Sequence, residues 1–232
     1  MKLLYSLILL LTCSFLFSEE LFTANIYSKQ NPNDIAYTHY NVQNFSGDST
    51  IIDHYYYTPE GLKYVLDRVI LVKDNPVYNS LKFFLIKEFS SLEKVGDEVI
   101  LTYERNGNRR QVHRKFQEPL VFAPTQQDAI SNNMDLLLDG EAVNFYIFAS
   151  EVLRLVKMKV KIIENSPYEK QDCVVFQMKP NNIFLDWFVD EVFYVVNKEN
   201  GRIIEMHGFS TLRQFDDGEW VFRDMDFYYN YK

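Results

Sequence analysis

The feature that most constrains the fold is a strict two-residue alternation in the second half of the chain. Between Val156 and Ile162, the apolar residues Val156, Met158, Val160 and Ile162 alternate with three lysines. Successive side chains of a β-strand point to opposite faces of its sheet, so this stretch predicts a strand with one buried face and one wet face. A half-exposed antiparallel sheet therefore supplies at least part of the core.

The same period of two predicts strands along most of the chain. The predicted strands are 35–45, 50–57, 62–73, 80–89, 98–105, 109–116, 142–148, 156–162, 171–178, 191–196, 202–206, 209–215 and 220–231. Hairpin turns are predicted at residues 46–48, 106–107, 199–201 and 216–218, where Gly accompanies Asn, Asp or Ser. Residues 58–61, Thr-Pro-Glu-Gly, suit either a turn or a helix cap, and the β-rich flanks favour the turn.

One main helix interrupts this pattern. Thr125 can cap it, Asp128 lies in its first turn where negative charge is favourable, and Gly140 ends it. Its apolar stripe consists of Ile130, Met134, Leu137 and Leu138. A shorter helical turn is predicted at residues 182–188. No alternation of strands and helices is present, so we expect a mostly β (α+β) fold, a curved antiparallel sheet forming a half-barrel wrapped around one main helix.

The N-terminus has the pattern of a secretory signal peptide. Lys2 is followed by the apolar run 3–11, and Ser18 precedes two glutamates. The run is too short for a comfortable membrane span. We expect residues 1–18 to be a signal peptide, 19–33 a flexible segment and 34–232 a single half-barrel domain, exported to the periplasm or the medium. Lipidation at Cys13 is the alternative way of processing this leader.

Composition limits the partners of such a chain. Its 232 residues suit one large β domain, and its formal net charge of −8 disfavours binding to nucleic acid. Aromatic residues make up 16% of the chain, and they favour strands. No segment after the leader is long and apolar enough to be a membrane-spanning helix.

Residues 137–208 resemble a known group of exported proteins. The resemblance rests on the run Leu137-Leu138-Asp139-Gly140-Glu141, the strand 173–180 and the segment 201–208 that closes the next hairpin. This stretch is similar to the half-barrel proteins that include the lipoprotein carrier LolA and the DUF3108-type proteins. The resemblance implies a curved sheet around helices with an apolar cavity, and it implies no catalytic residues.

Two serine motifs match catalytic patterns only in part. Residues 47–49, Gly-Asp-Ser, match the nucleophile block of some esterases, but a strand follows them and no aspartate lies three residues before a histidine. Ser91 and Lys94 have the Ser-x-x-Lys spacing without its partner motifs, which favours a surface loop.

Histidine and cysteine usage predicts neither a metal site nor redox chemistry. No two of His39, His54, His113 and His207 have a zinc-like spacing, and we expect all four to be ordinary sheet residues. Cys173 is expected to be a buried small hydrophobe. We therefore expect no catalytic residue, no metal and no cofactor.

These observations lead to a binding function as the first hypothesis. We expect a non-enzymatic exported protein that holds a lipid, an acyl chain or an acylated partner in an apolar cavity of the curved sheet. Strand alternation nominates as cavity residues Phe83, Leu85, Phe145, Ile147, Val156, Met158, Val160 and Phe193. A basic surface patch around the 106–107 turn could contact lipid headgroups or an acidic partner, and consists of Arg105, Arg109, Arg110, Arg114 and Lys115.

Three alternatives remain open at this point. The first is a structural or adhesive cell-envelope protein whose sheet has a filled core and whose surface binds an envelope protein. The second is an outer-membrane β-barrel, against which the helix stripe and the terminal Tyr231-Lys232 weigh. The third is a hydrolase.

Overall fold

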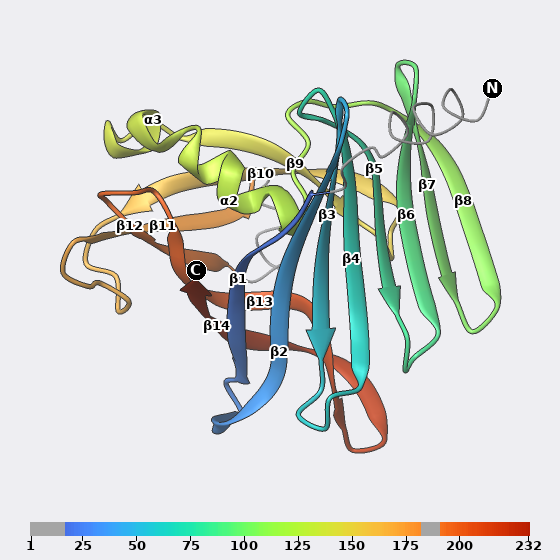
Figure 1. The fold of residues 1–232 in the computed structure, drawn as a ribbon, viewed down its shortest axis with the longest axis horizontal. Helices are drawn as coiled ribbons and strands as arrows, with labels where there is room; N and C mark the ends of the chain where they lie inside the picture. The colour runs from blue at the N-terminus through green and yellow to red at the C-terminus, as the bar shows by residue number, and fades with distance from the viewer. Residues whose placement is uncertain (1–16, 182–190) are drawn as a thin grey trace, which may run out of the picture.

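The computed structural model describes residues 17–181 and 191–232, and most of them belong to one antiparallel sheet of fourteen strands (Figure 1). Nearly all of the predicted signal peptide and the helical turn at 182–188 lie outside the described residues. The strands are β1 (Phe17–Ser28), β2 (Asn31–Ser46), β3 (Ser49–Tyr57), β4 (Lys63–Val72), β5 (Asn75–Phe83), β6 (Glu88–Val95), β7 (Glu98–Arg105), β8 (Asn108–Lys115), β9 (Val143–Ala149), β10 (Arg154–Ile163), β11 (Cys173–Pro180), β12 (Val192–Asn197), β13 (Ile203–Asp216) and β14 (Glu219–Tyr231).

The strands form two meanders that are joined by the ends of the chain. Strands β1–β8 follow one another on one side, β14 back to β9 follow one another on the other, and β1 pairs with β14. Phe22 of β1 is opposite Tyr231 of β14 in this pairing. Figure 1 shows that the two halves run at a steep angle to each other, which makes the sheet strongly curved. The predicted mostly β fold with a curved antiparallel sheet is therefore confirmed.

The segment 19–33 is not the flexible segment that the sequence predicts. Most of it forms β1 in the middle of the sheet, and β2 begins at Asn31. Its inward side chains Phe22, Ala24 and Ile26 are buried and alternate with polar or half-buried residues. It pairs with the adjacent β2 on one side and, on the other, with β14 about two hundred residues away in the chain, and local sequence patterns do not reveal this second pairing.

Several predicted boundaries also change. The predicted strand 80–89 is wrong, because β5 ends at Phe83 and a turn with Lys87 at φ 50° precedes β6. The predicted strands 202–206 and 209–215 are one strand, β13, whose register against β14 shifts between Phe209 and Arg213. The turns at 46–48, 58–61, 106–107, 199–201 and 216–218 are confirmed.

Strands β8 and β9 are the two outer strands of the sheet, and their free edges differ in what covers them. The segment after β8 crosses to β9, where Val121 N–H donates to the Tyr146 carbonyl and Tyr146 N–H donates to the Pro119 carbonyl, both at 2.8 Å. Strand β8 carries mostly exposed charged or polar side chains along its length. Such charge on an outer strand opposes pairing with other sheets.

The predicted long helix consists of shorter pieces: η1 (Ala123–Thr125), α2 (Gln126–Ser131) and α3 (Met134–Leu138). The break falls at residues 132–133, where the Asn133 side chain donates to the Ala129 carbonyl. Because of this interruption, the four predicted stripe residues do not share one buried face. Ile130 and Leu137 are buried, whereas Leu138 is exposed. Thr125 makes no side-chain cap to α2; its hydroxyl instead accepts from Phe122 N–H.

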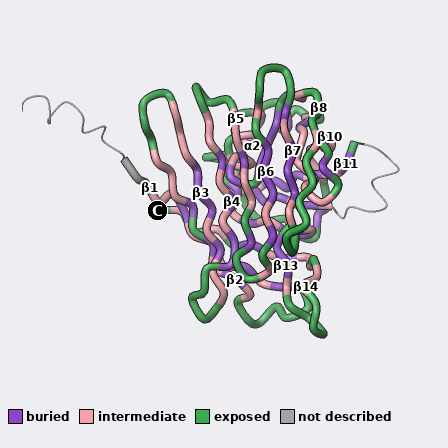
Figure 2. The backbone as a smooth tube through the Cα atoms, turned by 90° about the vertical axis from the view of Figure 1, so that its right-hand side faces the viewer, coloured by how far each residue is buried: buried purple, intermediate pink, exposed green. Residues whose placement is uncertain are grey.

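Side chains of the sheet make most of the core, and Figure 2 shows the buried residues concentrated in the middle of the strands. One cluster lies between α2, α3 and strands β9–β13, and includes Ile130, Leu137 and Phe176. A second is centred on Tyr64 and Phe227, and a third lies under β4–β8. Met206 and Tyr229 pack against both of the first two clusters, so the interior is continuous.

Candidate functional site: a pocket beneath helix α2

A pocket of about 430 Å³ lies where β1 and β14 meet under η1 and α2. Its walls come from β1–β3, the helical segment, the β12–β13 turn and the end of β14. The residues lining it are Glu19, Glu20, Leu21, Phe22, Asn41, Gln43, His54, Ala123, Pro124, Gln126, Gln127, Asp128, Ser131, Asn200, Arg202, Ile203, Tyr229, Tyr231 and Lys232. The site thus depends on the β1–β14 pairing that joins the two meanders.

Helix α2 is held over this pocket by Gln127. Its amide oxygen accepts from Ile203 N–H at 2.8 Å and lies 2.8 Å from the Tyr231 hydroxyl. Its amide nitrogen donates to the Ser131 hydroxyl at 2.7 Å and to the Gly201 carbonyl at 2.9 Å. Gln127 therefore fixes the helix to both β13 and β14, and its own hydrogen-bonding groups are occupied.

One part of the pocket wall is apolar and aromatic. The Phe22 ring lies edge-on to the Tyr229 ring, with centroids 5.2 Å apart. The Tyr231 ring also contacts Phe22, with centroids 5.4 Å apart. Leu21 and Ile203 complete this wall. Burial raises the pKa of Tyr229 well above its ordinary value, so its hydroxyl is neutral at physiological pH.

The base of the pocket is polar and deeply buried. Asn41 and His54 are opposite each other in the β2–β3 pairing, and the Asn41 amide nitrogen lies 2.6 Å from His54 Nε2. Asn41 Oδ1 and His54 Nδ1 have no hydrogen-bond partner, and the two residues are 2% and 4% exposed. His39 lies behind His54, with ring centroids 4.4 Å apart, and neither of its ring nitrogens has a partner.

These histidines are uncharged at neutral pH. Burial lowers the pKa of His54 to about 3, against the smaller opposing effect of Asp53. Burial also lowers the pKa of His39 well below its ordinary value, and His54 adds to the shift. An imidazole without its charge is both a donor and an acceptor, so the base contains hydrogen-bonding groups without net charge.

Charged side chains lie at the rim instead. Lys232 and Glu20 form an ion pair at 3.0 Å, and the Arg202 guanidinium lies 4.8 Å from the centre of the Tyr231 ring. Glu19 and Asp128 are exposed at the same rim. The pocket therefore changes in character from a charged mouth, through an aromatic wall, to an uncharged polar base.

The eight nominated cavity residues lie elsewhere, since none of them is on the wall of this pocket. Phe145, Met158 and Val160 are buried in the helix-side cluster, Ile147 and Val156 pack partly against it, and Phe83 belongs to the second cluster. Leu85 is 44% exposed in the β5–β6 turn. Phe193 is half-buried and contacts the Tyr168 ring, with ring centroids 5.4 Å apart.

The five residues of the predicted basic patch do not form one surface. The Arg110 guanidinium lies 5.2 Å from the centre of the Tyr103 ring and donates to the Glu151 carbonyl at 2.6 Å. Arg105 is 3.7 Å from buried Glu88. Arg109 and Lys115 are exposed on the other face of β8 from Arg110 and Arg114, because successive side chains alternate.

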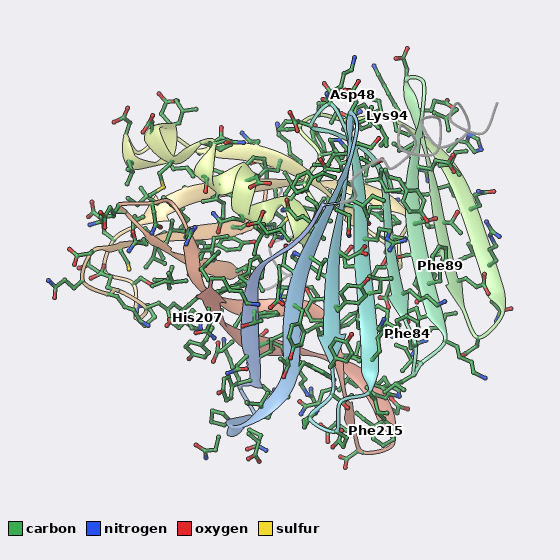
Figure 3. All side chains as sticks on the ribbon, in the orientation of Figure 1. Asp48, Phe84, Phe89, Lys94, His207 and Phe215 are labelled. Atoms are coloured by element: carbon green, nitrogen blue, oxygen red, sulfur yellow. The ribbon has the colours of Figure 1, made fainter. Side chains whose placement is uncertain are left out.

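The remaining motifs are placed as follows. Asp48 lies at the tip of the β2–β3 hairpin (Figure 3). Ser91 and Lys94 lie within β6, so the predicted surface loop is wrong, and their three-residue separation puts them on opposite faces. Cys173 is half-buried at the start of β11.

Within residues 17–181 and 191–232, no group of three His, Cys, Asp or Glu side chains is arranged to hold a metal ion, and no helix there could cross a membrane.

Two polar clusters were missed by the sequence analysis. His207, labelled in Figure 3, lies between the carboxylates of Asp226 at 2.8 Å and Glu205 at 3.1 Å, and Tyr168 stacks on its ring at 4.0 Å. Arg213, 2% exposed, donates to Glu88 at 2.9 Å and also bonds Glu151. Expecting all four histidines to be ordinary sheet residues was thus an oversimplification.

Comparison with known proteins supports the fold. No family model and no curated protein matches the sequence. The structure is similar to the crystal structure of a beta-barrel-like protein of the domain of unknown function DUF1849 from Brucella abortus, with a TM-score of 0.51 and 8% identity. The similarity covers 91% of this chain and 96% of that chain. At this identity the likeness concerns the fold alone: the chain has a beta-barrel-like fold.

Proposed function

We propose that this protein is an exported, non-enzymatic binding protein that holds a small amphipathic molecule in the pocket beneath α2. The observation that carries the proposal is the pocket itself, with an aromatic wall and buried polar groups at its base. Ligand sites of proteins are concave, mostly apolar and supplied with a few polar groups that fix orientation. A volume of about 430 Å³ lies within the usual range for such sites.

The packing of the interior favours a small ligand over a long acyl chain. Six of the eight nominated residues pack in or against the core clusters, so we place the guest in the pocket beneath α2 rather than in the middle of the sheet. Each buried CH₂ contributes about 0.8 kcal/mol, so an eight-carbon tail contributes about 6 kcal/mol before the costs of association. Micromolar to millimolar affinity is the expectation for such a ligand.

Export and the absence of catalysis are parts of this proposal that rest on the sequence. The charged, apolar and small-residue order of residues 1–18 supports export. The likeness to LolA and DUF3108-type proteins in residues 137–208 supports a carrier role within the cell envelope. A binding role requires the pocket but no set of catalytic side chains.

The test is a titration of the full chain with 1-N-phenylnaphthylamine, a dye that fluoresces in apolar sites. Ala123→Trp places a large ring at the exposed rim of the pocket and is expected to weaken dye binding at least tenfold. The control Val152→Trp adds the same ring in the exposed β9–β10 turn and should bind the dye as the wild type does. Equal binding by all three proteins would contradict the proposal.

A structural or adhesive role in the cell envelope is the second candidate. The observation that favours it is the continuous interior, in which Met206 and Tyr229 connect two packed clusters. In that case the pocket is a solvent-filled recess and the outer surface makes the functional contacts. Wild-type protein that binds neither dye nor any small molecule, yet is retained by isolated cell envelopes, would favour this candidate.

A further inference from the structure

Three apolar side chains are exposed at one end of strands β3–β6. Leu62, which precedes β4, is 56% exposed, and Phe84 and Leu85 in the β5–β6 turn are 37% and 44% exposed. The two segments are adjacent, because Phe84 N–H donates to the Tyr64 carbonyl at 2.8 Å. A single exposed apolar residue is ordinary, whereas several at one place indicate a contact surface.

Three lysines surround these side chains. The Lys63 ammonium lies 5.9 Å from the centre of the Phe84 ring, and the Lys82 ammonium lies 5.0 Å from it. Lys87 is exposed at the end of the same turn. The lysine ion pairs of the described residues involve other lysines, so none of these three has a carboxylate partner there. We call this group the Phe84 rim; it consists of Leu62, Lys63, Lys82, Phe84, Leu85 and Lys87.

The opposite end of the same strands is built differently. There Lys73 lies 3.7 Å from Asp48, and Lys94 lies 3.7 Å from Glu118. Figure 3 shows Asp48 and Lys94 at that end, away from Phe84. Lysines at that end therefore have carboxylate partners, whereas those of the Phe84 rim lie against aromatic rings.

The rim lies on the outer face of the sheet. Tyr64 is buried and stacks on Trp220 with ring centroids 5.2 Å apart, so the adjacent Lys63 points to the other face. The exposed Phe215 packs against the same Trp220, with centroids 5.4 Å apart. Phe215 thus belongs to the other side of β4, and two aspartates, residues 216–217, follow it.

Little negative charge offsets the lysines of the rim. Glu60 is the one acidic residue in segments 58–62 and 84–87. Asp53, on the outer face of β3, is 2% exposed and is bonded by Arg68 at 2.7 Å. The rim therefore combines exposed apolar groups with a local excess of positive charge.

We propose that the Phe84 rim attaches the protein to an anionic phospholipid surface, with its apolar side chains below the head groups and its lysines among them. Lysine suits this position because its apolar stem can lie along buried surface while its ammonium reaches polar groups. Anionic lipids attract cations held close to the membrane. The formal net charge of −8 does not prevent this contact, because charges farther apart than about 8 Å are largely screened at physiological salt.

This proposal does not depend on the pocket beneath α2, since no residue of the Phe84 rim lines that pocket. The first experiment sediments vesicles with the protein purified from the cells that make it. Vesicles of phosphatidylglycerol and phosphatidylcholine in equal parts are compared with vesicles of phosphatidylcholine alone, at low and at high salt. The wild type is expected to bind the anionic vesicles at least tenfold more tightly at low salt, and high salt should remove most of this preference.

Variants then locate the contact. Phe84→Ser with Leu85→Ser removes two apolar groups, and Lys63→Gln with Lys82→Gln removes two charges. All four side chains are exposed, so the fold should be kept. Each double variant is expected to weaken binding to anionic vesicles at least fivefold.

Matched controls make the same kinds of change at the opposite end of these strands. Val72→Ser with Val95→Ser removes two exposed apolar groups, and Lys73→Gln with Lys94→Gln removes two charges. Both control proteins should bind the anionic vesicles as the wild type does.

A tryptophan placed in the rim reports on the rim itself. Brominated lipid in the anionic vesicles should quench the fluorescence of Phe84→Trp more than that of the wild type, which has two tryptophans of its own. Val95→Trp, at the opposite end, should show no added quenching.

Three results would overturn the proposal. They are a wild type without preference for anionic vesicles, rim variants that bind as their controls do, and Phe84→Trp without added quenching. In the first case, retention of the protein by isolated envelopes that protease treatment abolishes would assign the rim to a protein partner.

Discussion

Two buried polar clusters inside the same sheet are built in opposite ways. The cluster around Arg213 consists of ion pairs: its guanidinium bonds Glu88 and Glu151, and Arg105 lies near Glu88. Around His54, the groups are uncharged and three of the four ring nitrogens of His39 and His54 have no partner. Glu88 Oε2 and Arg213 Nε in the first cluster also have no hydrogen-bond partner, so the presence of charge is what distinguishes the two clusters.

The Arg213 cluster connects parts of the chain that are not neighbours in the sheet. Glu88 is on β6, Glu151 is in the β9–β10 turn, and Arg213 is on β13. The Arg213 carbonyl also accepts from the hydroxyls of Tyr37 at 2.5 Å and Tyr64 at 2.8 Å. These bonds cross the interior and tie the two meanders together.

The largest expected effect comes from breaking this cluster. Arg213→Met leaves Glu88 buried beside a neutral side chain and is expected to lower the free energy of unfolding by about 3 kcal/mol, as for other buried ion pairs that lose one partner. Urea unfolding at pH 7 followed by circular dichroism measures this loss. The double variant Arg213→Met with Glu88→Leu should recover at least half of it; a double variant no more stable than the single one would show that pairing is not the cause.

The next effect concerns Asp67, a buried carboxyl that accepts from the Asn79 amide at 2.7 Å. Burial raises its pKa to about 7, well above the unfolded value of about 3.9. The folded state therefore binds the proton more tightly, and stability from this group is lost as the pH rises from about 4 to about 7. Asp67→Asn should be more stable than the wild type at pH 8, by at most the roughly 4 kcal/mol that a shift of three pKa units represents, and nearly equal to it at pH 4. Equal stability differences at both pH values would refute this account.

The His54 cluster gives a pH effect of the opposite sign. The folded pKa of His54 is about 3 and the unfolded value is about 6.5, so the unfolded chain binds the proton more tightly between these values. Stability therefore falls as the pH drops below about 6.5, and His54 contributes about 2 kcal/mol of the loss by pH 5. His54→Phe should reduce the difference in stability between pH 7 and pH 5 by that amount. The exposed His113→Phe is the control and should leave the difference unchanged.

The smallest expected effect sharpens the comparison most. Asn41→Leu combined with His54→Phe removes both members of a hydrogen-bonded pair together with their unpartnered atoms, and such exchanges are close to neutral. The free energy of unfolding at pH 7 should stay within about 1 kcal/mol of the wild type. A loss comparable to that of Arg213→Met would mean that the His54 cluster supports the fold as strongly as the charged one does.

Local patterns were enough to predict most of the sheet. The two-residue alternation around Met158 and the Gly-containing turns locate strands and hairpins because both depend on neighbouring residues. The Asn41–His54 pair was also within reach, since a hairpin closed at Gly47-Asp48 places those two residues opposite each other. Spacing along the chain does not reveal this pair, because the two residues meet across the hairpin.

The rest depends on contacts between distant residues. The pairing of β1 with β14 and the bond from Arg213 to Glu88, 125 residues away, leave no local signature. The pocket needs both ends of the chain and helix α2 together, so strand alternation nominated core residues such as Phe145 in its place. Alternation reports which face of a strand is buried, and it does not report whether that face meets a ligand or another side chain.

The most direct test of the central claim is native mass spectrometry of the full chain purified from the cells that make it, without detergent. The account predicts a fraction of the protein with one added small molecule, and predicts that Ala123→Trp, prepared in the same way, lacks this species while Val152→Trp retains it. Wild-type protein that carries the mass of the polypeptide alone in repeated preparations, and that also fails to bind the dye, would contradict the claim that the pocket beneath α2 is a binding site.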